Sequence, residues 1–190
     1  MPDLYIIAGP NGAGKTTAGM TILPDVLHIK EFINADAIAA GISPFNVEDV
    51  AFQAGRIMLE RIDQMIAKEK SFAIETTLST KSYHTLIKEA KEKGYTVIIL
   101  FFWLKNAELA KSRVKNRVLH GGHNIPEDVI ERRYYKGIYN LINHFIHLCD
   151  IWVLFDNSLI QPRMIAKGIK DSEIEIIDTE LFDLLTANAK

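Results

Sequence analysis

The residues best suited to chemistry lie near the start of the sequence, in the run Gly9-Pro10-Asn11-Gly12-Ala13-Gly14-Lys15-Thr16. The run fits the pattern G-x-x-x-x-G-K-[ST], and a second threonine, Thr17, follows it. Glycines allow a backbone to wrap a phosphate with its N–H groups turned inward, in conformations that a side chain would obstruct. Lys15 would reach the β- and γ-phosphates of a nucleotide, and the Thr16 hydroxyl would be a Mg²⁺ ligand. We therefore predict that residues 9–17 bind a nucleotide.

The segments on either side of this loop are those that the motif requires. The apolar run at residues 4–8 predicts a buried strand leading into the loop, and residues 15–23 predict a short helix that ends before Pro24. The helix N-terminus would add its dipole to the phosphate site. The alternative is a glycine-rich turn before a helix that never meets a nucleotide.

Composition narrows the class of protein. A chain of 190 residues with 48% hydrophobic content predicts one domain spanning residues 1–190. The net charge of -2 gives no general attraction to nucleic acid or to a membrane surface, so we expect a small-molecule partner and neither of those two. The single cysteine, Cys149, excludes an internal disulfide framework. With no signal-peptide pattern and no run near the ~20 apolar residues of a membrane span, we predict a cytoplasmic protein.

Strand and helix patterns alternate along the remaining chain. The expected strands are residues 31–34, 71–74, 96–104 and 151–155, with an edge strand at 173–177. The expected helices are residues 47–68, 82–93, 107–119, 126–148 and 179–185. This order predicts an α/β protein of the P-loop NTPase type, with a doubly wound, mostly parallel sheet of five or six strands.

Acidic and hydroxyl side chains fall where two of these strands end. Asp36 follows the strand at 31–34, and Glu75, Thr76 and Thr77 follow the strand at 71–74. Because parallel strands bind ligands at their carboxyl ends, we predict Asp36 as a general base for an acceptor hydroxyl. Glu75 would orient the acceptor or hold a Mg²⁺-bound water, with both threonines donating hydrogen bonds to the substrate. The alternatives are an N-cap role for Asp36 and purely structural hydrogen bonding for Glu75.

Arginines lie on two expected helices that are joined by a glycine-rich hinge. Residues 107–147 therefore predict a helical lid over the phosphates, in which Arg117 and Arg133 form a clamp. Solvated or ion-paired arginines are the alternative. His120 and His123 have a spacing found in metal sites, but no third ligand accompanies them, so we expect them to cap or line the hinge.

Several segments stand in an order that is similar to one known family. They are residues 9–17, Phe32-Ile33-Asn34-Ala35-Asp36, Phe72-Ala73-Ile74-Glu75-Thr76-Thr77-Leu78-Ser79, residues 113–126, Arg132-Arg133-Tyr134 and Asp156-Asn157-Ser158. On these segments, within residues 4–158, the chain resembles the zeta-toxin-like family of P-loop kinases.

The resemblance implies ATP- and Mg²⁺-dependent phosphorylation of a small molecule, which in characterised toxins is a nucleotide sugar such as UDP-N-acetylglucosamine. It implies Asp36 as the catalytic base, Glu75 as a substrate-contacting carboxylate, and Arg117 and Arg133 as phosphate-contacting arginines. Characterised toxins usually carry Asp-Asn-Asp near the base, whereas this chain has Asn34-Ala35-Asp36. GTP as the nucleotide and an antitoxin as a protein partner stay open.

Two other classes of nucleotide-binding protein share such a loop. A transport-type ATPase module would also carry a Leu-Ser-Gly-Gly-Gln signature and an apolar strand ending in Asp-Glu, and the sequence has neither. A P-loop ATPase or nucleotide-dependent switch that acts through a protein partner would not need Asp36 or the lid arginines. We therefore expect a kinase that transfers phosphate to a small hydroxyl compound.

Overall fold

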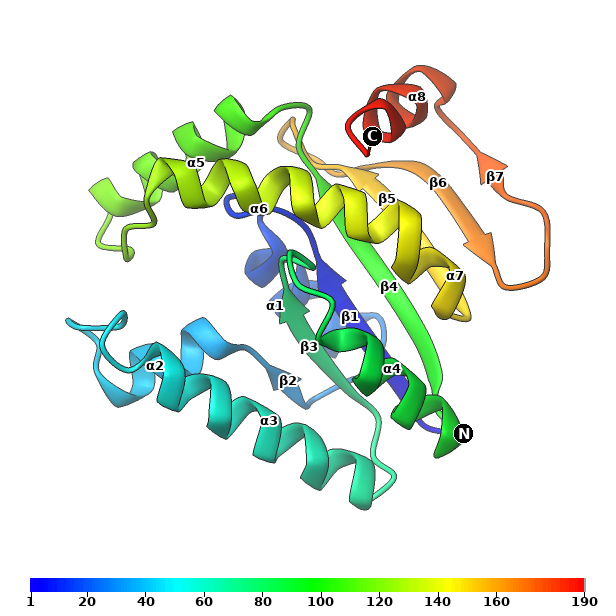
Figure 1. The fold of residues 1–190 in the computed structure, drawn as a ribbon, viewed down its shortest axis with the longest axis horizontal. Coiled ribbons are helices and arrows are strands. Elements are labelled where there is room, and N and C mark those ends of the chain that lie inside the picture. Colours follow the sequence, from blue (N-terminus) through cyan, green and yellow to red (C-terminus); the bar gives the residue numbers. More distant parts are fainter. Residues whose placement is uncertain (190) are drawn as a thin grey trace.

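The structure is a computed structural model that describes residues 1–189, and a seven-stranded sheet runs through it (Figure 1). The strands are β1 (Asp3–Ala8), β2 (Phe32–Ile33), β3 (Phe72–Thr76), β4 (Thr96–Trp103), β5 (Ile151–Asp156), β6 (Arg163–Ile169) and β7 (Glu175–Ile176). Their order across the sheet is β2-β3-β1-β4-β5-β6-β7. The first five in this order are parallel, and β6 and β7 are antiparallel additions at one edge.

Helices lie on both sides of the sheet (Figure 1). They are α1 (Lys15–Asp25), α2 (Ala35–Ile42), α3 (Ala51–Ala67), α4 (Tyr83–Glu92), α5 (Ala107–Leu119), α6 (Glu127–Asn140), the π-helical turn η1 (Leu141–Phe145), α7 (Ile146–Leu148) and α8 (Thr179–Ala187). In Figure 1, α3, α4 and α6 lie in front of the sheet and α1 lies behind it. Each helix within residues 1–189 is too short or too polar to cross a membrane.

The centre of the sheet is dry because its strands are apolar on both faces. Seven of the eight residues of β4 are buried, the pattern expected for a parallel strand covered on both sides. The register pairs Ala8 with both Thr76 and Phe101. The loop after β1 therefore starts level with the ends of β3 and β4, so that all three loops meet at one edge.

The α/β class and the mostly parallel sheet are confirmed, but the expected number of strands was too low. The described sheet has seven strands rather than five or six. The strand that the sequence did not reveal is β6, which pairs with β5 through an irregular register at Leu154 and Phe155. Four of its seven residues are exposed, and the buried ones do not alternate with them, so the strand carries no clear alternation of apolar and polar side chains.

Several helix boundaries also differ from the expected ones. Helix α1 continues past Leu23 and contains Pro24 in its last turn, although proline has no N–H group to donate there. The predicted helix at 47–68 begins at Ala51, and the predicted helix at 126–148 is divided by the wider π-helical turn η1. The sequence did not predict α2, whose N-cap is Asn34: its side chain accepts from the backbone N–H of Ala37 at 3.1 Å. The N-cap alternative for Asp36 is therefore wrong.

Helix α6 holds the loop between β3 and α4 in an unusual conformation. Leu78 is fully buried and has φ of +53°, in the left-handed region that non-glycine residues rarely occupy. Asn140 of α6 donates from Nδ2 to the carbonyl of Leu78 at 2.8 Å. At Gly137, an added Cβ would lie 2.5 Å from the carbonyl oxygen of Thr77. The close approach of α6 to this loop therefore requires a glycine.

We expect Gly137→Ala to lower the free energy of unfolding by about 1–3 kcal/mol, because the methyl group must push α6 away from the Thr77 carbonyl. Equilibrium urea unfolding measures this change. Gly55→Ala is the matched control: Gly55 lies in α3 and an added Cβ there meets nothing within 4 Å, so its stability should stay equal or rise by about 0.5–1 kcal/mol. Equal effects of the two substitutions would contradict this account of α6.

Candidate active site

The loop between β1 and α1 has the backbone conformation that its glycines predict. Gly9, Gly12 and Gly14 all have positive φ, at +143°, +77° and +74°. An added Cβ at Gly9 would lie 2.1 Å from the Phe102 carbonyl oxygen, so the loop lies directly against β4. Successive residues in such conformations turn backbone N–H groups to one side and bind anions. The loop therefore fits a phosphate group.

Lys15 is buried at the floor of this loop. Its side-chain Nζ donates to the carbonyl oxygen of Pro10 at 2.9 Å and lies 3.7 Å from Oε1 of Glu75. Burial lowers the pKa of Lys15, while the carboxylates of Glu75 and Asp36 oppose that effect and Arg117 adds to it. The ammonium group is thus poorly hydrated and held at the inner side of the loop, where a phosphate oxygen would be a strong partner.

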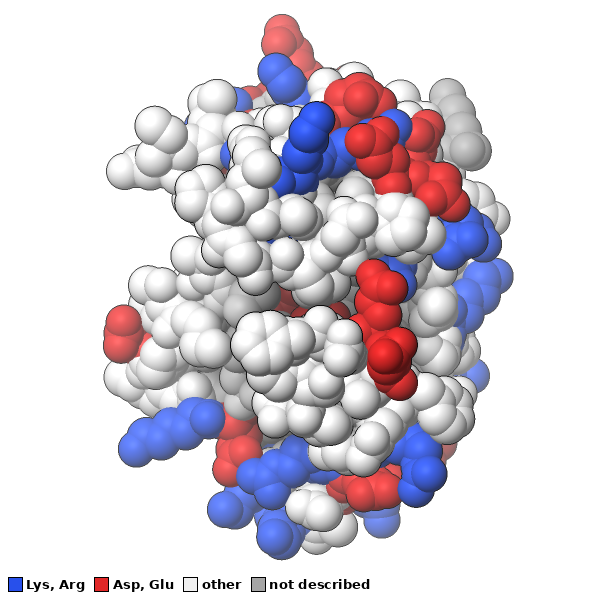
Figure 2. Space-filling model, turned by 90° about the vertical axis from the view of Figure 1, so that its left-hand side faces the viewer, with Lys and Arg blue, Asp and Glu red and all other residues white. Residues whose placement is uncertain are grey.

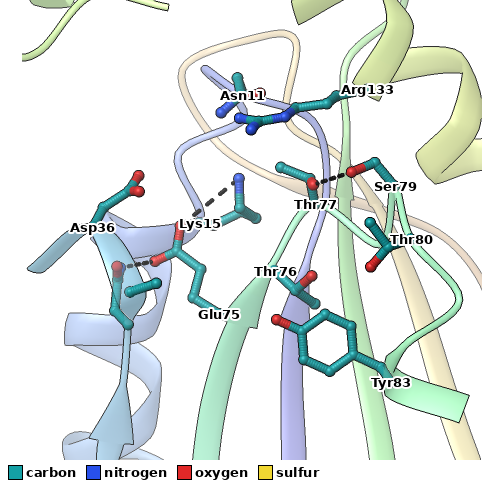
Figure 3. Close-up of a pocket in the computed structure, with 12 residues that line it drawn as sticks. Asn11, Lys15, Asp36, Glu75, Thr76, Thr77, Ser79, Thr80, Tyr83 and Arg133 are labelled. Carbon is teal, nitrogen blue, oxygen red and sulfur yellow. Dashed lines mark hydrogen bonds and ion pairs between the residues drawn. The ribbon is translucent and has the colours of Figure 1, made fainter. Parts of the chain in front are cut away.

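The Glu75 carboxylate joins three segments of the site. Its Oε2 accepts from the hydroxyl of Thr16 at 2.7 Å, and it also accepts from Nδ2 of Asn34. The Glu75 side chain is only 11% exposed, and Figure 3 shows its carboxylate between Lys15 and Asp36. The Glu75 side chain therefore contacts both Lys15 and Thr16 of the phosphate loop and Asn34 at the end of β2.

Thr16 and Glu75 supply the oxygen atoms that a Mg²⁺ ion prefers. Such an ion keeps several waters and takes few protein ligands when it is bound with phosphates, so a hydroxyl and a nearby carboxylate fit it. Within residues 1–189 there is no group of three or more His, Cys, Asp and Glu side chains that could hold a metal by itself. His120 instead bonds through Nδ1 to the carbonyl of Asn116 at 2.8 Å, at the end of α5.

Asp36 lies in the first turn of α2, and its side chain is exposed to solvent. It lines three hollows, and Lys15 and Glu75 line two of these as well. The larger of the two has a volume of about 260 Å³. Figure 3 shows Asp36 on one side of this hollow, with Lys15 and Glu75 beside it and Asn11 and Arg133 above. A free carboxylate therefore shares a cavity with the buried lysine of the phosphate loop.

Hydroxyl groups line the opposite side of the same hollow. Thr76 accepts from the backbone N–H of Leu78 at 3.0 Å, and the hydroxyls of Thr77 and Ser79 are bonded to each other at 2.9 Å. The hollow is also lined by Thr80 and Tyr83, which the sequence did not single out. A hydroxyl is both a donor and an acceptor, so this wall retains capacity for a polar ligand.

The two predicted lid arginines lie on different sides of the site. Arg117 donates to the carbonyl of His123 at 3.2 Å and lines the hollow of the phosphate loop. Arg133 is half-buried and lines the hollow that contains Asp36, and it makes no hydrogen bond or ion pair with a described residue. The structure thus brings both guanidinium groups to the site.

Two residues beside the phosphate loop, Arg113 and Asn157, had no assigned role in the sequence analysis. Arg113 donates to the carbonyls of Asn157 and Ser158 at 2.8 and 2.9 Å. Asn157 in turn donates from Nδ2 to the Ala13 carbonyl at 2.7 Å, so α5 and the end of β5 are tied to the loop. Asn11 is 6% exposed and its Oδ1 has no partner among the described residues, which leaves a buried acceptor beside the hollow. Two sequence signals could have identified these residues: Arg113 lies four residues before Arg117 on the same helix, and Asn157 directly follows the last parallel strand.

Asp156 holds the turn that carries Asn157. It is 3% exposed and accepts from the backbone N–H of Ser158 at 2.9 Å and from Arg163 at 3.2 Å. Burial raises the pKa of Asp156, but these hydrogen bonds outweigh burial and hold the pKa below the usual 3.8. Because the folded-state pKa is the lower one, the ionised group stabilises the fold above the unfolded-state pKa and loses this effect as pH falls through the folded-state pKa.

A search against protein families and known structures adds independent findings. A sequence model of the zeta toxin family matches residues 1–143. An uncharacterized protein of Haemophilus influenzae is 35% identical over 126 residues, which are 66% of this chain and 88% of that protein.

Solved structures show the same fold at low sequence identity. A chain of the AvrRxo1-ORF1:-ORF2 crystal structure with ATP matches at a TM-score of 0.78 and 18% identity, over 100% of this chain and 65% of that one. The PezAT toxin-antitoxin system of Streptococcus pneumoniae matches at a TM-score of 0.66 and 15% identity, over 99% and 86%. A gluconokinase of Sinorhizobium meliloti matches at 0.52 and 15% identity, over 99% and 91%. The chain therefore spans about two thirds of the first of these structures.

The sheet order, the phosphate loop and these likenesses define a P-loop protein of the kinase-like class. Within that class, the chain belongs to the zeta toxin family, whose model covers most of its length.

We expect Asp156→Asn to lower the free energy of unfolding by about 1–3 kcal/mol at neutral pH, because Arg163 and the Ser158 N–H lose an ionised acceptor. The difference from the unsubstituted protein should shrink as pH falls from about 5 to about 3. Urea unfolding at several pH values measures it. Asp63→Asn is the control, since Asp63 is exposed and has no side-chain hydrogen bond or ion pair to a described residue. A loss that is the same at every pH would contradict the role of the ionised carboxylate.

Proposed function

We propose that this protein is a phosphotransferase that uses ATP and Mg²⁺ to phosphorylate a hydroxyl group of a small metabolite. One observation carries the proposal: Asp36, an exposed carboxylate, lines the same hollow as Lys15 of the phosphate loop. Transfer requires a held γ-phosphate, an aligned acceptor and a group that takes the acceptor's proton. The hollow provides a residue for each of these tasks.

Residues of the phosphate loop would hold the nucleotide. They are Gly9, Pro10, Asn11, Gly12, Ala13, Gly14, Lys15, Thr16 and Thr17. Thr16 would be a direct ligand of Mg²⁺, and Glu75 would hold a water on the ion or orient the acceptor. When bound, the ion neutralises charge on the β- and γ-phosphates. We propose that the adenine ring of the nucleotide lies against the exposed side chains of Leu159 and Ile160, which line a hollow with Arg113.

The transfer step then needs only groups that lie at this site. The Asp36 carboxylate accepts the proton of the acceptor hydroxyl, whose oxygen forms a bond to the γ-phosphorus. The bond between that phosphorus and the bridging oxygen of ADP breaks, and ADP leaves. Lys15, Arg117 and Arg133 would stabilise the charge on the phosphate oxygens, and Thr76 and Thr77 would bind the acceptor. We propose that residues 107–147 act as the lid that excludes water.

The arrangement favours transfer over a switch or a simple ATPase. A nucleotide-dependent switch needs neither a free carboxylate beside the phosphate loop nor a wall of hydroxyl groups on the far side of the hollow. Asp36, Thr77 and Ser79 have positions that suit an alcohol held in front of Lys15. Phosphate transfer to a hydroxyl compound would support the kinase, and slow hydrolysis unaffected by every acceptor would support a switch.

The resemblance to zeta toxins also implies an antitoxin partner, and this stays a prediction. The Streptococcus pneumoniae structure comes from a toxin-antitoxin system. We propose that this chain arrests growth when it is expressed alone, and that Asp36→Asn removes the arrest. Unimpaired growth with active enzyme present would contradict a toxin role while leaving the kinase proposal intact.

We expect Asp36→Asn to lower the turnover number for phosphate transfer by about 10²–10⁴-fold, because the acceptor proton loses its base. ATP affinity should change little, since Asp36 is outside the loop that binds the nucleotide. Transfer of label from γ-labelled ATP or GTP to a panel of sugars, nucleosides and nucleotide sugars measures the first effect, and calorimetric titration with ATP measures the second.

Two comparison variants make this result specific. Asp63→Asn removes an exposed carboxylate that lines none of the hollows described above, and it should retain turnover. Lys15→Ala should weaken ATP binding and also lose transition-state stabilisation, on the order of 10²–10³-fold in turnover. Transfer by Asp36→Asn at the rate of the unsubstituted protein would remove Asp36 from the mechanism.

A further inference from the structure

The hollow around Asp36 continues outward to the surface. Next to the hollow that Asp36 shares with the hydroxyl groups, a second hollow is lined by Asp36 and Arg133 and also by Val47, Glu48 and Ile125. A third, at the opening, lies between residues 44–49 and residues 121–124 and shares Val47, Glu48, His123 and Asn124 with the second. Because neighbouring hollows share these residues, they adjoin one another between the proposed base and the surface, and we refer to them together as the outer path. An acceptor that extends from the reacting hydroxyl toward residues 44–49 and 121–124 would lie along it.

The charged side chains on this path are mostly acidic. At the opening, Glu48 and Asp49 are the charged lining residues, and no Lys or Arg of the described residues lines that hollow. In the second hollow, Asp36 and Glu48 face a single cation, Arg133. Figure 2 views the end of the molecule where these loops meet: white and red residues border its hollowed middle, and blue residues gather above and below. The outer path is therefore electronegative.

Such a path is unsuited to an acceptor that carries phosphate groups. Proteins hold phosphates with Arg or Lys side chains or with the N–H groups of a helix N-terminus. The cations that line a hollow together with Asp36 are Lys15, Arg113, Arg117 and Arg133. The proposed function already uses Lys15, Arg117 and Arg133 on the transferred phosphate, and Arg113 is bonded to two backbone carbonyls. A nucleoside diphosphate that extends outward from the hydroxyl would meet Glu48 and Asp49 instead. Its negative phosphates and these two carboxylates would repel each other.

The inner wall suits a different class of compound. Thr77, Ser79, Thr80 and Tyr83 present hydroxyl groups to the hollow, and each hydroxyl can donate one hydrogen bond and accept others. Two of them, Thr77 and Ser79, are already bonded to each other and are thereby held in place. A neutral compound with several hydroxyl groups matches this wall, and an amine on its outer part would be attracted to Glu48.

We propose that the phosphate acceptor is a phosphate-free alcohol, such as a sugar, polyol or amino alcohol, and not a nucleotide sugar. This inference rests on the proposed kinase function and specifies the substrate class of the same site. Residues Glu48 and Asp49 select against anionic acceptors, and the hydroxyl wall binds the reacting end of the alcohol.

Matched pairs of acceptors test the inference. Each pair has the same sugar without phosphate and with it, for example N-acetylglucosamine and UDP-N-acetylglucosamine, or glucosamine and glucosamine 6-phosphate. Transfer from γ-labelled ATP gives kcat/KM for both members. We expect the best acceptor of the panel to be phosphate-free and to exceed its phosphorylated counterpart by about tenfold or more at low ionic strength. A phosphorylated best acceptor overturns the inference.

Charge reversal at the opening provides a second, independent measurement. In the double variant Glu48→Lys with Asp49→Lys, the ratio of kcat/KM for the anionic member to that for the neutral member should rise on the order of tenfold, and added salt should reduce the rise. Both residues are exposed, so the protein should fold. Glu60→Lys is the control, because Glu60 is exposed on α3 and lines none of these three hollows. An unchanged ratio in the double variant overturns the selective role of the two acids.

Failure of the inference and failure of the proposed function have different signatures. If label passes to nucleotide sugars in preference to their phosphate-free partners, the kinase function stands and the inference is wrong. If label passes to no compound of either class while ATP is still bound, the proposed function is wrong and the inference falls with it.

Discussion

The site depends on the buried carboxylate of Glu75 at the end of β3. It accepts hydrogen bonds from Thr16 of the phosphate loop and Asn34 at the start of α2, and it lies 3.7 Å from the ammonium group of Lys15. These contacts hold the loop against the segment that carries Asp36. They also hold a carboxylate that is only 11% exposed, and charged or hydrogen-bonded partners make its burial tolerable. A phosphate and a metal ion could replace those partners, so the same contacts that fix the site prepare it for a nucleotide.

Different elements of the fold hold the two sides of the site around Glu75. On the side of the phosphate loop, Asp156 and Asn157 at the end of β5 tie that strand to the loop, which a glycine allows to lie directly on β4. On the acceptor side, Asn140 and Gly137 of α6 fix the loop that carries the hydroxyl wall. Helix α6 also carries Arg133. Movement of that helix would therefore change both the proposed clamp and the acceptor wall together.

Local signals were enough to predict much of this structure. The glycine-lysine motif, the apolar strands and the helix over Ala107–Leu119 were identified from residue types and periodicity, and the expectation that strand ends meet placed Asp36 and Glu75 together. Long-range contacts were not predictable in this way. Asn34 meets Glu75 because Ile33 pairs with Ile74, and the wall at Thr80 and Tyr83 depends on a left-handed backbone at Leu78. Strand β6 was missed because its exposed and buried residues do not alternate.

The central claim is that a nucleotide lies on the phosphate loop with its terminal phosphate facing residue 36. A crystal structure of the Asp36→Asn variant with Mg²⁺ and a non-hydrolysable ATP analogue tests it most directly. The account predicts that Nζ of Lys15 contacts the β- and γ-phosphates, and that Oγ1 of Thr16 leaves Glu75 and coordinates the ion. It also predicts that the γ-phosphate faces the hollow lined by residue 36. A nucleotide bound elsewhere, or a terminal phosphate turned away from residue 36, would contradict the account.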